Sequence, residues 1–244
     1  GTGHLTRTLT ERWPTARVVG VDSSDSMLEQ ARSLSHPGRL EFARGDIENW
    51  RPSEPVDLFV SNAALQWIPG HESLLTRLAG ALSPDGTRAV QMPDRFADTP
   101  SQAVIEAVNA DPRWASRLSG VGLHRDSVKP LKWYVEFFLD LGFTVDAWET
   151  VYCHVLHGED PVLEWLKGTA LRPLLARLDE DESSAYQGLL ADRFRACYPP
   201  RRGVTLFPFP RLFFVADRDG LSPDGRSGSR GTLSSRSSRL GIAT

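Results

Sequence analysis

The sequence predicts an α/β fold built on a parallel sheet. In the first half of the chain, short apolar segments alternate with stretches whose apolar residues recur at helical spacing, and this alternation is typical of βαβ units. A Gly-x-Gly pair opens the chain, and an acidic residue, Asp22, ends the next apolar segment. Both features are expected where a parallel sheet binds a nucleoside cofactor.

The elements of the first half follow from local patterns. Residues 5–12 have helical character after the glycines, and residues 17–22 are a short apolar run of the kind found in buried parallel strands. Residues 23–26 offer N-caps for a helix. The other expected elements are a helix with apolar positions over 27–34, strands at 40–43, 56–60 and 87–92, and a helix over 74–82 followed by a turn at 84–86.

The second half is richer in helical patterns. We expect helices at 99–117, 127–141, 161–168 and 180–197, and strands at 144–156 and 211–216. Pro208 and Pro210 are expected to confine the start of the last strand to an edge or a bend, because proline cannot donate to a sheet.

From about Leu221 the composition turns to Ser, Gly and Arg. Such a segment buries too little apolar area to offset the entropy of ordering it, so residues 221–244 are predicted to be a disordered tail. Its four arginines against one acid leave open a weak arm that touches RNA or a membrane.

Composition restricts the classes of function. The chain has 244 residues, is 40% apolar and 24% charged, and carries a net charge of −3, so it has no overall basic field for nucleic acid. No apolar run approaches the roughly 18 residues that a membrane helix needs. Two cysteines, Cys153 and Cys197, fit a reduced compartment. We expect a cytoplasmic protein without nucleic-acid or membrane partners, and the oligomeric state stays open.

The opening glycines favour binding of an anionic ligand. Glycine lets the backbone approach a ligand closely, and the following helix presents unpaired N–H groups to it. Asp22 at the end of the next strand can accept hydrogen bonds from ribose hydroxyls. A dinucleotide fingerprint needs a third glycine where this chain has Thr6, and a bare Gly-x-Gly also fits a simple tight turn. Asp46 follows another short strand, where an acid can accept the adenine amino group.

Five segments in series carry a resemblance to a known family: GTGHLT, VVGVDSSDSML, ARGDIENW, FVSNAALQW and LSPDGTRAVQMPD. Together they resemble class I S-adenosylmethionine-dependent methyltransferases, and more narrowly the trans-aconitate methyltransferase family. VDAWETVYCHVL, PVLEWLKGTALRP and FPRLFFVA resemble the acceptor half of that family. The resemblance covers residues 1–217.

The resemblance implies a Rossmann-like class I methyltransferase sheet with a helical acceptor-binding insertion. It implies one domain over 1–220, with a cofactor half at 1–95 and an acceptor part at 96–220, before the tail at 221–244. In that family a strand precedes the glycine loop and lies between the strands that we expect at 17–22 and 56–61. The sheet is therefore expected to lack its first strand, which would leave two unpaired strand edges and a slot.

The resemblance also implies the cofactor and the residues around it. The cofactor is S-adenosylmethionine, and its expected contacts are Gly1, Gly3, Asp22, Ser23, Met27, Asp46, Ile47, Asn62 and Ala63. The expected acceptor-binding residues are Trp67, Tyr152, Arg172 and Arg211, with His154 as an alternate. For each acceptor residue, an ordinary packing or surface role remains the alternative.

The implied reaction needs no acid–base residue. A carboxylate has a reference pKa of about 4, so it is already ionised at neutral pH. We therefore predict no catalytic residue, and expect the protein to position the reactants and exclude water. The string Cys153-His154-x-x-His157 suggests a metal site, but alternate residues of a strand face opposite ways. We therefore predict no metal.

The leading hypothesis is methyl esterification of a small polycarboxylate, with trans-aconitate implied by the resemblance. One alternative keeps the cofactor and changes the acceptor to another small acid or metabolite. A nicotinamide-dependent oxidoreductase is disfavoured by Thr6 at the third glycine position. A truncated, non-catalytic fragment is the reading that the missing first strand favours.

Overall fold

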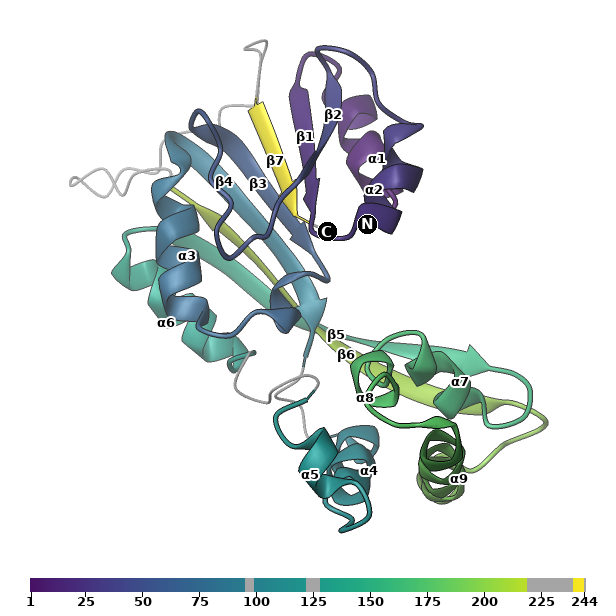
Figure 1. Cartoon of the computed structure of the whole chain (residues 1–244). Coiled ribbons are helices and arrows are strands. Elements are labelled where there is room, and N and C mark those ends of the chain that lie inside the picture. The colour runs from purple at the N-terminus through teal and green to yellow at the C-terminus, as the bar shows by residue number, and fades with distance from the viewer. Residues whose placement is uncertain (95–98, 122–127, 219–238, 244) are drawn as a thin grey trace. The chain divides into compact units, whose positions relative to one another are not determined.

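Figure 1 shows the computed structural model, which describes residues 1–94, 99–121, 128–218 and 239–243, the last segment by its backbone. The chain forms two compact units. The first contains residues 1–92, 129–149 and 212–244, and the second contains residues 93–128 and 150–211. The predicted division at residue 95 into a cofactor half and an acceptor part stays a prediction.

The strands form a seven-stranded sheet in the order β2-β1-β7-β3-β4-β6-β5. β1 pairs in parallel with β2 and β7, and β3 pairs in parallel with β4 and β7. The predicted α/β fold with a parallel sheet is confirmed in this part of the chain. The strands are β1 (Arg17–Asp22), β2 (Leu40–Arg44), β3 (Val56–Asn62), β4 (Leu82–Pro93), β5 (Thr144–Leu156), β6 (Thr205–Asp217) and β7 (Arg239–Ala243).

β7 corrects the predicted tail over 221–244 at its last residues. Residues 219–238 and 244 lie outside the described part, but Arg239–Ala243 pairs with β1 on one side and β3 on the other. It occupies the slot that the sequence predicted between these strands, as Figure 1 shows in yellow. The physical reason is that both edges of the slot carry unpaired backbone groups, and a parallel strand satisfies them.

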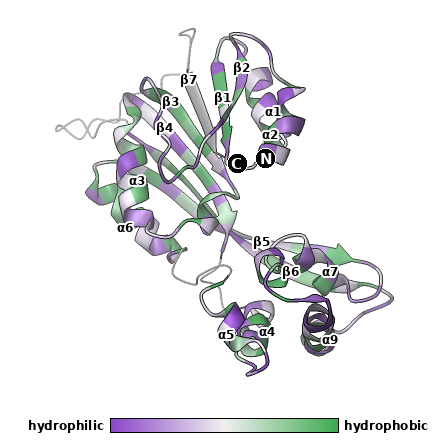
Figure 2. Cartoon of the chain, viewed as in Figure 1, coloured by the Kyte–Doolittle hydropathy of each residue, from purple (hydrophilic) through white to green (hydrophobic). Residues whose placement is uncertain are grey.

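The described residues of the first unit contain four helices and one 3-10 turn: α1 (His4–Arg12), α2 (Asp25–Arg32), η1 (Leu65–Trp67), α3 (His71–Gly80) and α6 (Leu131–Asp140). Figure 2 shows mostly hydrophilic residues on α1 and α2 and hydrophobic ones along β1. α6 begins later than the predicted residue 127, because its N-cap is Pro130 and the residue before a proline avoids the helical conformation.

The close packing of α1 on β1 explains how the fold does without a third glycine at Thr6. Thr6 is buried, and a Cβ added to Gly20 of β1 would lie 3.3 Å from the Thr6 methyl group. The same Cβ would lie 2.6 Å from Cδ1 of Phe42. The absence of a side chain at Gly20 of β1 therefore leaves room for Thr6, so α1 can pack closely on the strand without a glycine at position 6.

The predicted turn at 84–86 lies inside β4. Leu82 pairs with Val56 and Thr87 pairs with Leu58, so the residues between Leu82 and Thr87 bulge opposite Asp57 alone. The Ser83 hydroxyl donates to the Asp57 carboxylate over 2.9 Å. The turn residues thus interrupt the pairing without ending the strand.

The second unit has its own apolar core around Trp114, Tyr186 and Phe207. The predicted helix over 99–117 is wrong at its middle, because the chain leaves helical geometry around Pro112, which has no N–H to donate. The helices are α4 (Pro100–Asn109), α5 (Ala115–Leu118), α7 (Pro161–Lys167), α8 (Arg172–Leu175) and α9 (Glu180–Cys197). None of the helices within the described residues is long and apolar enough to cross a membrane.

β6 starts six residues before the predicted Arg211 and includes both prolines. β4 ends at Pro93, and the next residue, Asp94, donates its backbone N–H to the Pro210 carbonyl over 2.9 Å. The residues of β6 that precede Pro210 therefore lie beyond the end of β4. Pro208 is one of them, so its missing N–H removes no hydrogen bond to that strand.

Candidate functional site

The carboxyl ends of three adjacent strands lie level with one another in the first unit. Ala243 of β7 is in register with Val21 on one side and with Ser61 on the other. The next residues of β1 and β3 are Asp22 and Asn62. The structure therefore brings these two predicted residues to one edge of the sheet, where parallel sheets bind ligands.

Asp22 is held by two donors. Its Oδ1 accepts the backbone N–H of Ser24 over 2.7 Å, and its Oδ2 accepts from the amino group of Gly1 and pairs with it. Burial lowers the pKa of the Gly1 amino group to about 6. The side chain of Asp22 is 12% exposed, and each carboxylate oxygen can accept a second hydrogen bond. The Ser24 contact therefore orients the acid, which retains the capacity to accept from further hydroxyl groups.

Gly3 is the residue that makes the opening loop a close-fitting cradle. Its φ is 82°, in the left-handed region, and an added Cβ would lie 2.7 Å from the Phe42 ring. Both facts require glycine. Gly3 caps α1 without a side-chain hydrogen bond, so the first amide groups of that helix are available to a ligand.

A short turn carries Asp46. The N–H of Gly45 donates to the Asp22 carbonyl over 3.0 Å, which ties this turn to the end of β1. The Asp46 side chain is exposed, and its Oδ1 accepts the N–H of Glu48 over 3.0 Å. Ile47 is buried. The predicted adenine-binding pair thus lies directly beside the predicted ribose-binding acid.

Asn62 and Ala63 form the third part of this edge. Ala63 has a φ of 52°, which is unusual for a residue with a side chain. Its N–H donates to the Gln91 carbonyl over 2.9 Å, and its carbonyl accepts from Gln66 Nε2 over 2.7 Å. Hydrogen bonds at both its N–H and its carbonyl therefore hold Ala63 in a strained backbone conformation, as is found in many functional loops. Of the remaining predictions in the first unit, Ser23 is exposed, Met27 is half-buried and Trp67 is 45% exposed.

Arg77 on α3 is a contact that the sequence did not predict. Its Nη1 donates to the Trp50 carbonyl over 2.7 Å, and its Nη2 donates to the Ile47 carbonyl over 2.6 Å. Burial, and then the charge of Arg51, lower the pKa of Arg77. An arginine beside the apolar stripe of a predicted helix gives no signal in the sequence, because most such arginines face solvent.

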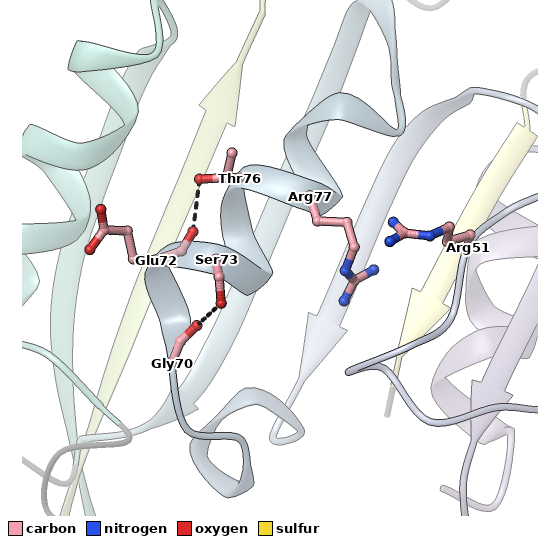
Figure 3. Close-up of a pocket in the computed structure, with 6 residues that line it drawn as sticks. All are labelled: Arg51, Gly70, Glu72, Ser73, Thr76 and Arg77. Carbon is pink, nitrogen blue, oxygen red and sulfur yellow. Dashed lines mark hydrogen bonds between the residues drawn. The ribbon is translucent and has the colours of Figure 1, made fainter.

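Arg77 and Arg51 also border an open hollow of about 650 Å³. Figure 3 shows the two guanidinium groups pointing toward one another from α3 and from the segment after the Asp46 turn. None of the predicted site residues lines this hollow, whose lining is Arg51, Gly70, Glu72, Ser73, Thr76 and Arg77.

Three of the predicted acceptor residues meet in the second unit. Arg211 of β6 lies over the Tyr152 ring at 5.6 Å and over the Phe209 ring at 5.1 Å. The Tyr152 and His154 rings are stacked at 6.5 Å. Burial lowers the pKa of Arg211, while its cation is stabilised by the two ring faces. The result is an oriented guanidinium on one face of the β5–β6 pair.

His154 packs among further aromatic rings. Its ring lies 5.3 Å from Trp165 and 6.0 Å from Phe209. Its Nε2 is buried and has no hydrogen-bond partner within the described residues. A buried polar atom without a partner is costly, so this nitrogen is a candidate contact for a ligand.

Arg172 is not brought to this group. It is the first residue of α8, its side chain is exposed, and among the described residues it forms no hydrogen bond, ion pair or ring contact with Tyr152, His154 or Arg211. No three His, Cys, Asp or Glu side chains gather as metal ligands among the residues that the structure describes.

The two groups have different chemistry. The edge of β1, β7 and β3 offers backbone amides and two carboxylates, which suits a ligand with hydroxyl and amino donors. The group on β5 and β6 offers a guanidinium, a phenol and an imidazole, which suits an organic anion.

Comparison with known proteins agrees with these observations. Residues 1–86 match a family model described as a methyltransferase domain. A trans-aconitate 2-methyltransferase of Streptomyces avermitilis is 43% identical over 90% of this chain and 82% of its own length. Another, of Streptomyces coelicolor, is 44% identical over 88% of this chain and 73% of its own length. A candidate methyltransferase of Bacillus halodurans C-125 shares the fold with a TM-score of 0.54 at 13% identity, over 89% of each chain.

Proposed function

The chain belongs to the trans-aconitate 2-methyltransferase family, and we propose that it methylates a carboxylate of trans-aconitate. It is an S-adenosylmethionine-dependent methyltransferase. The observation that carries the proposed acceptor is the identity of 43% and 44% to two relatives of that name over most of the chain.

The geometry at the edge of the first unit fits the cofactor. The loop at Gly3 leaves no room for a Cβ, and the N-terminus of α1 faces it without a side-chain cap. In the proposed arrangement Gly1 and Gly3 line the methionine end, and Asp22 accepts from the ribose, with Ser23 and Met27 beside it. Asp46 accepts from the adenine amino group beside Ile47, and Asn62 and Ala63 line the amino-acid end.

The proposed acceptor site is the group on β5 and β6. Arg211 would pair with a carboxylate, and Tyr152 and His154 would donate to the same anion. His154 is suited to this because its Nε2 has no partner within the described residues. Trp67 and Arg172 complete the proposed acceptor set. Both side chains are exposed, and their inclusion rests on the family resemblance alone.

The reaction itself needs no base from the protein. The bound cofactor supplies a methyl group on a positively charged sulfur. With that group held at the edge of β1, β7 and β3, an ionised carboxylate oxygen of the acceptor would take the methyl group as an ester, and the sulfur would leave as a neutral thioether. Because the acceptor carboxylate has a pKa of about 4, it is ionised at neutral pH. The residues above therefore bind and align the reactants.

A methyl-transfer assay across four acids tests the acceptor. The protein is incubated with methyl-labelled S-adenosylmethionine and with trans-aconitate, cis-aconitate, citrate or isocitrate, and ester formation is measured. We expect trans-aconitate to have the highest kcat/KM. If S-adenosylhomocysteine binds but none of the four acids is esterified, the acceptor is a different molecule and the substrate proposal is refuted.

We also propose a cytoplasmic location, which both free cysteines support.

A further inference from the structure

We propose that Arg77 is a positioning residue for cofactor binding, which holds the turn at residues 45–50 so that Asp46 meets the adenine ring. This inference rests on the proposed role of Asp46. Arg77 would act through the turn, because its two hydrogen bonds go to backbone carbonyls of the turn.

Packing and hydrogen bonds together fix the turn, and Ile47 in its middle is buried. The Asp46 carbonyl accepts the N–H groups of Asn49 and Trp50 over 2.9 Å and 2.6 Å, so these bonds close the turn internally. Gly45 attaches one end of the turn to β1. The carbonyls of Ile47 and Trp50 receive the fork of Arg77, which attaches the other side to α3.

The shape of arginine matters for this role. Two nitrogen atoms of a planar guanidinium hold two carbonyls at a fixed separation, which a lysine ammonium cannot reproduce. Hydrogen bonds from a charged donor are also roughly twice as strong as neutral ones. The guanidinium therefore holds Asp46 in one conformation before a ligand arrives. Binding then does not have to order the turn, so its entropic cost is lower.

Arg51 provides a matched control in the same hollow. Figure 3 shows its guanidinium facing that of Arg77, but no hydrogen bond or ion pair of its side chain is found in the described residues. Replacing Arg51 removes one positive charge beside the turn and leaves the two carbonyl contacts of Arg77 intact. A loss of affinity that comes from charge alone would appear in both variants.

The experiment compares two ligands by calorimetry. S-adenosylhomocysteine carries the adenine amino group, whereas S-inosylhomocysteine has a carbonyl oxygen at that position and cannot donate to Asp46. In Arg77→Met we expect the affinity for S-adenosylhomocysteine to fall by roughly tenfold, the scale expected when a ligand must order a loop. The affinity for S-inosylhomocysteine should hardly change, so the ratio between the two ligands shrinks.

The controls separate the possible causes. Arg51→Met should keep the ratio of the parent chain, Arg77→Lys should recover part of it, and Asp46→Ala should lose it. A ratio that Asp46→Ala lowers but Arg77→Met leaves unchanged would overturn the role of Arg77 and keep that of Asp46. A ratio that neither variant changes would refute the proposed adenine contact, and the present inference with it.

A second measurement needs no ligand. Amide hydrogen exchange at Asn49 and Trp50 should be at least about tenfold faster in Arg77→Met than in the parent chain, because the turn opens locally. Exchange in α1 should be the same in both chains. Equally fast exchange throughout would mean that the substitution destabilises the whole unit, and would count against a positioning role.

Discussion

His71 and Tyr134 share a buried hydrogen bond of 2.6 Å that joins the first turn of α3 to α6. The other ring nitrogen of His71 lies 2.8 Å from the Leu65 carbonyl, which can only accept, so Nε2 carries the proton. Nδ1 then accepts from the Tyr134 hydroxyl, whose oxygen in turn accepts the N–H of Lys129 over 3.0 Å. The arrangement is complete only for a neutral imidazole.

This relationship predicts that stability falls in mild acid. Burial is the largest cause that lowers the pKa of His71 below its ordinary value of 6.5. Below pH 6.5 the unfolded chain therefore takes up a proton that the folded chain resists. The free energy of unfolding should decrease with falling pH in that window, by at most about 1.4 kcal/mol per pH unit.

Urea unfolding at pH 7.5, 6.5 and 5.5 measures this effect. His71→Gln should be less stable at neutral pH, but its stability should depend less on pH than that of the parent chain. The exposed His36 supplies the control, because His36→Gln should retain the full dependence. Parallel pH profiles for the parent and His71→Gln would refute the assignment to His71.

A chain that ends at residue 238 should be much less stable than the full chain. Without Arg239–Ala243, the facing edges of β1 and β3 lose their pairing partner. Several buried backbone groups left unpaired at roughly 1–3 kcal/mol each should remove most of the stability of the first unit. Thermal unfolding followed by circular dichroism measures the loss.

A point substitution tests the same strand without shortening the chain. Gly241→Pro removes a backbone donor from the middle of β7 and should also destabilise, because proline is not tolerated in a central strand. Gly228→Pro, in the predicted tail outside the described residues, is the control and should be neutral. If both prolines leave the melting temperature unchanged, β7 does not contribute to the sheet.

The missed strand shows which part of the fold was beyond the sequence. β1, β2 and β3 have local apolar runs that end at acids or turns, and each was expected at nearly its observed bounds. Arg239–Ala243 has one glycine in five residues and follows a Ser/Gly/Arg stretch, so its pattern is no stronger than that of a tail. What makes it a strand is the slot between two strands more than 170 residues earlier, which only tertiary structure reveals.

Some residues of the candidate site could be placed from the sequence, and others could not. Asp22 and Asn62 could be placed from the rule that parallel strands present their carboxyl ends at one edge, and the register agrees. Arg77 could not, because its partners are backbone carbonyls that carry no side-chain signature. Tyr152, His154 and Arg211 were anticipated through resemblance, while the aromatic rings that surround them on α7 and β6 depend on packing.

Arg88 supports a prediction about stability alone. Its side chain is 0% exposed, between the rings of Phe59 and Phe138 at 5.6 Å and 5.0 Å. Its Nη1 reaches the Leu75 carbonyl at 3.4 Å, whereas Nε and Nη2 have no partner in the described part of the chain. Burial, and then the charge of Arg218, lower the pKa of Arg88 to about 9.

Arg88→Met should therefore raise stability, because methionine fills a similar length without burying unpaired donors. Replacing buried ion pairs by apolar residues of similar volume is often neutral or gains about 1–4 kcal/mol. Arg88→Ala should instead destabilise by about 2–5 kcal/mol, as other large-to-small core substitutions do. Urea unfolding of the three chains distinguishes these effects. A methionine variant as unstable as the alanine variant would show that the buried charge stabilises the fold.

Arg211 is the proposed partner of an acceptor carboxylate. Arg211→Ala should raise the KM for trans-aconitate by roughly 10–100-fold, since a charged hydrogen-bonding pair contributes about 1.5–3 kcal/mol. Affinity for S-adenosylhomocysteine should stay the same, because Arg211 belongs to a group distinct from the residues at the edge of β1 and β3. Arg172→Ala should have a smaller effect, because no ring among the described residues orients that exposed side chain in the way that Tyr152 and Phe209 orient Arg211.

Arg193→Ala, on the exposed side of α9, is the matched control and should leave both constants unchanged. Arg211→Lys separates charge from shape, because lysine keeps the positive charge but loses the fork that binds a carboxylate through two parallel hydrogen bonds. A KM for Arg211→Lys close to that of Arg211→Ala would identify the fork as the element that recognises the acid. Unchanged kinetics in the Arg211 and Arg172 variants would instead remove both arginines from the acceptor site.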